Sequence, residues 1–166
     1  MSAPLAALED ALTEEIRLER ELAAAGGRKR DALVALDAAG VDQATSREQN
    51  LLVALAAAAE RRLRRTAEAA RLFAVPEAEI SVTRIAAAAG EPVRARLLAL
   101  AGGLREALKE VFRVNVANRA LTEQSLDHVK RFFRILGGAR EPGVYSRRGF
   151  PQARPENPKV MFDEVV

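Results

Sequence analysis

Few side chains in this 166-residue chain could carry chemistry, because it has no cysteine and a single histidine, His128. Disulfides and thiolate sites need cysteine, and zinc or triad chemistry needs a histidine with partners. Apart from Asp127, the carboxylates at helical spacing from His128 are a turn away or more. The three glycine pairs lack the strand context and the Lys-Ser/Thr of a phosphate loop. We therefore predict no catalytic residues, no cofactor and no metal.

The densest basic cluster consists of Arg61, Arg62, Arg64 and Arg65. On a helix these residues spread over a wide arc, and Glu60 and Glu68 stand at distances suited to pairing with them. No aromatic residue is interleaved for base stacking, and 26 basic against 23 acidic residues give a net charge of only +3. The pattern indicates a solvated helix face and no nucleic-acid partner.

Composition and periodicity place nearly all residues on helices. Alanine, leucine and arginine contribute 34, 20 and 22 residues, and all three rank high in helix propensity. Apolar residues recur at steps of three and four. The sequence predicts an all-α fold: an elongated antiparallel helical bundle or coiled-coil hairpin, with a long C-terminal helix and an extended tail. The predicted helices cover residues 3–39, 45–73, 82–89 and 92–137.

Helix-ending and helix-capping residues mark these boundaries. Gly40 is predicted to follow the end of the first helix, and Thr45 with Glu48 forms a capping box for the second, with Asp42 as the rival cap. Ser81 is predicted to cap the third helix. The helices are therefore expected to be separated by turns at these positions.

Glycine and proline also predict the larger divisions of the chain. Gly26–Gly27 interrupts the first helix in phase, which predicts a kink or a close helix crossing. Four prolines follow residue 138. We therefore expect a helical domain over residues 1–138 and an extended tail over 139–166.

The charges of the N-terminal segment and the length of the apolar runs indicate where in the cell the protein is located. Six acids and two arginines stand in the first 24 residues, and the longest apolar run, residues 51–59, falls well short of the roughly 20 residues of a membrane span. We therefore predict a cytoplasmic protein without stable membrane insertion.

The long last helix carries one stripe that is apolar at both ends and polar in the middle. Its predicted members are Leu97, Ala101, Leu104, Leu108, Val111, Asn115, Asn118, Thr122, Ser125, Val129, Phe132 and Leu136. Asn115 and Asn118 either pair across the bundle and set its register, or face a partner or ligand.

Beyond Ser125, apolar residues occupy more of the helix circumference than a single stripe would cover. Either the first or second helix folds over this surface, or an amphipathic helix of another protein lies on it. Five of the seven aromatic residues lie in the stretch from Phe132 to Phe162. This concentration favours a contact region.

Two asparagines three apart, a leucine and a Ser-Leu pair stand between Asn115 and Leu126, followed by an apolar end and a segment with Tyr145. This order of features resembles the FlgN family of flagellar type III export chaperones, and the specific part of the resemblance is the stretch from Asn115 to Gly149. The resemblance implies a cytoplasmic chaperone that binds the C-terminal helices of hook–filament junction (hook-associated) proteins. It also implies delivery of these clients to the membrane export gate, without catalysis.

The resemblance also suggests which residues act. The client-binding candidates are Leu121, Leu126, Val129, Phe132, Phe133 and Leu136. Tyr145 is either a docking residue for the export gate or a tyrosine that pins the tail to the bundle. The alternative function is a structural coiled-coil protein that self-assembles through the stripe of the last helix.

Overall fold

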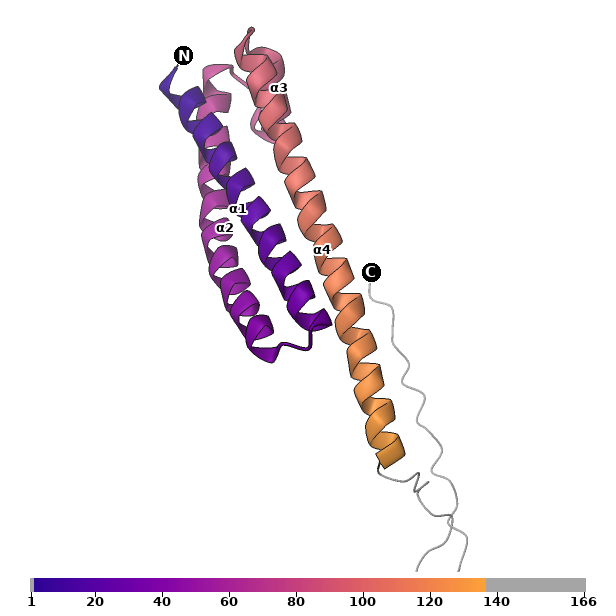
Figure 1. Ribbon diagram of the computed structural model, residues 1–166. Helices are drawn as coiled ribbons and strands as arrows, with labels where there is room; N and C mark the ends of the chain where they lie inside the picture. Colours follow the sequence, from indigo (N-terminus) through magenta and orange to yellow (C-terminus); the bar gives the residue numbers. More distant parts are fainter. Residues whose placement is uncertain (1, 137–166) are drawn as a thin grey trace, which may run out of the picture. The chain divides into compact units, whose positions relative to one another are not determined.

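The computed structural model describes residues 2–136, and the contacts of the chain divide it into two compact units, residues 1–125 and 126–166. The described residues form four α-helices and one 3-10 turn (Figure 1): α1 (Ala3–Val34), α2 (Ala38–Leu72), η1 (Glu77–Glu79), α3 (Val82–Ala88) and α4 (Val93–Leu136). The predicted all-α helical bundle is confirmed. The predicted tail, residues 139–166, lies outside the described residues.

The first two helices pack side by side along their length as an antiparallel hairpin (Figure 1). Three ion pairs cross between them: Arg62 Nε to Glu15 Oε2 at 2.6 Å, Arg47 Nη2 to Glu21 Oε2 at 2.6 Å, and Lys29 Nζ to Glu48 Oε2 at 2.8 Å. Because each pair joins an early residue of one helix to a late residue of the other, together they favour one register.

The turn between α1 and α2 differs from the prediction. Helix α1 ends at Val34 instead of residue 39, and α2 begins at Ala38 instead of residue 45. Leu36 takes the left-handed conformation (φ 57°) that glycine usually supplies after a helix, and the N–H of Asp37 donates to Ala32 O. Because this turn carries no glycine, no helix-ending residue type marked it at Leu36.

Asp37 caps α2, and the predicted cap was wrong. The Gly40 N–H donates to Asp37 Oδ1 at 3.0 Å, so Gly40 lies in the first turn of α2. A Cβ on Gly40 would stand 2.4 Å from Asp37 Oδ2, which explains the glycine. Glu48, assigned to a capping box, instead pairs with Lys29.

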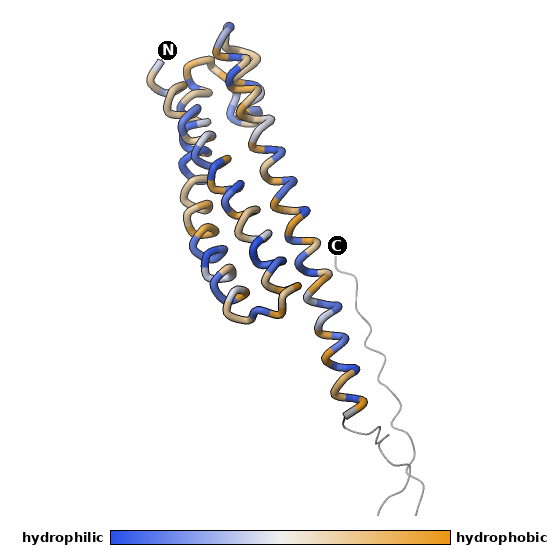
Figure 2. The backbone as a smooth tube through the Cα atoms, viewed as in Figure 1, coloured by the Kyte–Doolittle hydropathy of each residue, from blue (hydrophilic) through white to orange (hydrophobic). Residues whose placement is uncertain are grey.

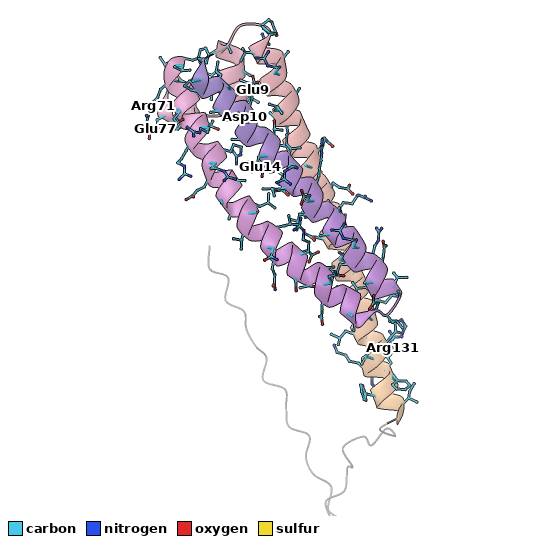
Figure 3. All side chains as sticks on the ribbon, turned by 60° about the vertical axis from the view of Figure 1, so that its left-hand side comes forward. Glu9, Asp10, Glu14, Arg71, Glu77 and Arg131 are labelled. Carbon is cyan, nitrogen blue, oxygen red and sulfur yellow. The ribbon has the colours of Figure 1, made fainter. Side chains whose placement is uncertain are left out.

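The boundaries of the last two helices follow the prediction closely. The Arg84 N–H donates to Ser81 Oγ at 3.2 Å, which confirms Ser81 as the cap of α3. Helix α4 begins at Val93 and ends at Leu136, within one residue of each expected boundary. Arg96 on α4 pairs with Glu9 of α1, which Figure 3 labels, at 3.1 Å.

The larger core cluster joins all four helices. Leu8 and Leu12 of α1, Ile85 of α3 and Leu97 of α4 are the largest fully buried side chains. A second cluster lies within the hairpin and consists of Leu18, Leu22, Ala25, Leu51, Leu55 and Ala58. Helix α4 is thus attached to the hairpin by apolar packing at its N-terminal end.

The buried carboxylate of Glu19 in α1 destabilises the folded state. Glu19 is 8% exposed, and no ion pair of Glu19 is found within residues 2–136. Burial raises the pKa of Glu19 above its usual 4.5, and the neighbouring Glu15 carboxylate raises it further. The ionised form is therefore disfavoured in the folded state.

Glu19→Gln is expected to raise the free energy of unfolding at neutral pH by about 1 kcal/mol. The pKa of Glu19 is higher in the folded than in the unfolded state, so its penalty is absent below the unfolded pKa and grows as pH rises through the folded pKa. Chemical denaturation at acidic and neutral pH measures the difference, which should shrink in acid.

Glu14→Gln on the same helix is the control for Glu19. Hydrogen bonding from Arg17 lowers the pKa of the exposed Glu14, the opposite direction. This variant should therefore lose a little stability at neutral pH. An equal gain from Glu19→Gln at both pH values would contradict an electrostatic cause.

Candidate functional site

Helix α4 contacts the hairpin through one row of buried or half-buried residues. The row consists of Leu97, Leu100, Leu104, Ala107, Val111, Val114, Asn118 and Leu121. The predicted stripe shares every second member of this row up to Asn118. Its alternate members Leu108 and Asn115 lie one residue too far along the chain and are exposed.

The register of α4 is decided where it crosses α1 near Gly26. A Cβ on Gly26 would stand 2.6 Å from Val114 Cγ1, so only glycine allows this approach. The predicted close crossing at Gly26–Gly27 is therefore confirmed, and α1 continues through it without a break. Val114, and not Asn115, fills the contact because its apolar side chain fits against bare backbone.

The two asparagines of α4 have different environments. Asn118 is buried and donates from Nδ2 to Gly26 O at 2.8 Å, the kind of pairing across the bundle that one alternative expected. Its Oδ1 is buried and has no hydrogen-bond partner in the described structure. Asn115 is exposed, so the alternative in which both asparagines pair across the bundle does not hold for Asn115, whereas the alternative in which it faces a partner or ligand stays a prediction.

The C-terminal end of α4, residues 126–136, carries many apolar residues, which alternate with polar ones along the helix (Figure 2). The exposed fractions of its large apolar side chains lie between 49% and 77% for Leu126, Val129, Phe132, Phe133 and Ile135. The rings of Phe132 and Phe133 contact edge to face, with centroids 6.3 Å apart.

Helical geometry places these residues on one side. At about 100° per residue, the large apolar side chains of residues 126–135 fall within one half of the circumference. The charged residues Asp127, Lys130, Arg131 and Arg134 fall within the other half. The segment is thus strongly amphipathic.

The other predicted site residues, Leu121, Leu136 and Tyr145, are either less accessible or lie partly or wholly outside the described residues. Leu121 is half-buried and belongs to the row that packs within residues 1–125, so it is less accessible than the residues after Ser125. Leu136 is the last residue of α4, and its side chain lies outside the description. Tyr145 also lies outside the described residues. Ile135, the most exposed apolar residue of the segment, was missing from the predicted set.

A second apolar surface lies between α1 and α4 within residues 1–125. It is a groove of about 630 Å³ whose lining includes Ile16, Ala24, Leu100 and Gly103. Arg17 at its rim is bound by Glu14, labelled in Figure 3, and by Glu21. No sequence pattern indicated this groove, because it depends on which faces of the two helices meet.

The arginine cluster of α2 is largely paired. Arg62 bonds to the buried Glu15, Arg65 to Glu68 at 2.7 Å, and Arg64 lies 3.8 Å from Glu60. Surface pairs elsewhere behave similarly: the Arg113 guanidinium holds the pKa of Glu110 below its usual value. The cluster is thus a charge-paired helix face, as predicted.

Neither a metal-binding group of side chains nor a membrane-spanning helix is found within residues 2–136. No group of three or more His, Cys, Asp or Glu side chains within residues 2–136 is arranged to hold a metal ion. Within the same residues, every helix is too short or too polar to cross a lipid bilayer.

The fold and the exposed face define a class of protein: an all-helical binding protein whose last helix presents an amphipathic surface. The family model described as FlgN protein matches residues 1–153, so the chain belongs to the FlgN family. It is therefore a flagellar export chaperone. Comparisons with curated proteins and with solved structures give no match.

Proposed function

We propose that the apolar face of residues 126–136 binds the C-terminal amphipathic helices of hook-associated proteins. The observation that carries this proposal is the exposure of Leu126, Val129, Phe132 and Phe133 on one side of a helix in an export chaperone. Such a face fits a client helix whose own apolar side would otherwise self-associate. Binding, and not catalysis, is the proposed action.

The wider role follows from the same binding. In the cytoplasm, covering the terminal helices of hook-associated proteins would prevent their premature assembly, and the chaperone would then deliver them to the export gate. Tyr145 is the proposed contact for that gate. Asn118 is the proposed register residue, because it joins α4 to the backbone of α1.

Self-assembly through the stripe of α4 is the rival function. Two members of this stripe, Leu97 and Asn118, are already buried within residues 1–125, so they are not available to a second copy. Sedimentation of the full chain at increasing concentration tests the rival. A monomer at all concentrations would count against it.

Phe132→Asp is expected to weaken client binding by about 10- to 100-fold, because burying an aromatic side chain is worth roughly 1.5–3 kcal/mol. The measurement is calorimetric titration of the full chain with the C-terminal segment of a hook-associated protein. Circular dichroism of the variant should remain unchanged, since Phe132 is 58% exposed.

Phe112→Asp is the matched control for this experiment. Phe112 lies on the same helix and is 71% exposed, but it lies outside residues 126–136. Its variant should bind clients as the wild type does. Equal losses in the two variants, or none in Phe132→Asp, would place the client site elsewhere.

A further inference from the structure

The polar side of residues 126–136 is distinctly basic. Lys130, Arg131 and Arg134 stand against one carboxylate, Asp127, and all four side chains are exposed. Figure 3 labels Arg131 near the C-terminal end of α4. The segment therefore combines an exposed apolar half with a cationic half.

These cations are mostly uncompensated. Lys130 Nζ lies 3.9 Å from Asp127 Oδ1, a loose pair, and neither Arg131 nor Arg134 has an ion pair within residues 2–136. Earlier on the same helix, by contrast, Lys109, Arg113 and Arg119 pair with Glu106, Glu110 and Glu123 at 2.6–2.9 Å. Arg113 and Arg119 are thus paired, whereas Arg131 and Arg134 are not.

This combination fits the surface of an anionic bilayer. A helix with Phe and Leu on one side and Lys and Arg on the other lies in the plane of the lipid interface, with its rings at the level of the acyl boundary. The cations then face the anionic headgroups. An apolar client helix explains the exposed phenylalanines but leaves the unpaired arginines without a counterpart.

We propose that residues 126–136 bind reversibly to the surface of a membrane rich in anionic lipid. Phe132 and Phe133 enter the interface, while Lys130, Arg131 and Arg134 bind the headgroups. This contact lies on the membrane and does not span it. Because the apolar residues are shared, client and membrane exclude each other; that consequence alone rests on the proposed function.

Vesicle binding by the full chain tests the proposal. The wild type should sediment with vesicles of equal parts phosphatidylglycerol and phosphatidylcholine, and not with pure phosphatidylcholine. Raising the salt concentration should release it, since exposed charges are screened. Arg131→Glu/Arg134→Glu should bind the anionic vesicles roughly a hundredfold more weakly.

The matched control is Arg113→Glu/Arg119→Glu, which makes the same change of charge on the same helix outside the segment. Binding to the mixed vesicles should fall far less than in the first variant. The proposal is overturned by absent wild-type binding, by equal binding to neutral vesicles, or by equal losses in the two variants.

A client titration separates this proposal from the proposed function. Arg131→Glu/Arg134→Glu keeps the apolar face and should bind the client segment as the wild type does, whereas Phe132→Asp should lose both client and vesicles. Vesicle binding without client binding would refute only the chaperone site. Client binding without vesicle binding would refute only the membrane proposal.

Discussion

Leu97→Ala is expected to lower the free energy of unfolding by about 2–5 kcal/mol, the largest stability effect we predict. Leu97 is fully buried in the cluster where Leu8 and Leu12 of α1 meet Ile85 of α3. Shortening its side chain removes apolar contacts and leaves a cavity at the junction of all four helices. Chemical denaturation followed by circular dichroism measures the loss.

Leu98→Ala provides the control for this experiment. Leu98 is the next residue of α4, and 42% of its side chain is exposed. The same truncation should cost less than about 1 kcal/mol there. Similar losses at the two positions would mean that α4 does not pack on the hairpin through the face described.

Gly26→Ala and Gly27→Ala are expected to change stability in opposite directions. At Gly26 the new Cβ would stand 2.6 Å from Val114 Cγ1, so α1 and α4 must separate or Val114 must shift, at a typical cost of about 1–3 kcal/mol. At Gly27 nothing lies within 4 Å of the new Cβ. Only the gain in helix propensity, roughly 1 kcal/mol, remains there.

Because both changes carry the same propensity gain, the difference between the two variants isolates the helix crossing. It should be about 1–3 kcal/mol in thermal or chemical unfolding. Adding Val114→Ala to Gly26→Ala should remove the clash and restore part of the stability. If Gly26→Ala stabilised the protein as much as Gly27→Ala, the close approach of α4 to α1 would be refuted.

The turns between the helices show where a local sequence signal predicts a helix boundary correctly and where it fails. Ser81 was predicted as a cap because serine is strongly preferred just before a helix, and the Arg84 N–H does donate to its hydroxyl. The α1–α2 turn was misplaced because Leu36 adopts a left-handed conformation without the usual glycine. Gly40 then appeared to be the helix end, although it is explained by the cap at Asp37.

The prediction of which row of α4 packs against α1 failed for a different reason. In α4, two rows of residues one position apart have similar apolar character, so periodicity alone could not separate them. Packing separates them, because Val114 fits against Gly26 whereas Asn115 is left exposed. The cost of a steric clash depends on both helices and is invisible in either one alone.

The sequence by itself determined that the fold is all-α, that Gly26–Gly27 marks either a kink or a close helix crossing, and that the end of α4 is apolar. It also carried the FlgN resemblance, which the family match confirms. These properties are local, since propensity, caps and composition act within a few residues. Only the tertiary structure decided which row of α4 faces α1, because the fit of Val114 against Gly26 depends on both helices.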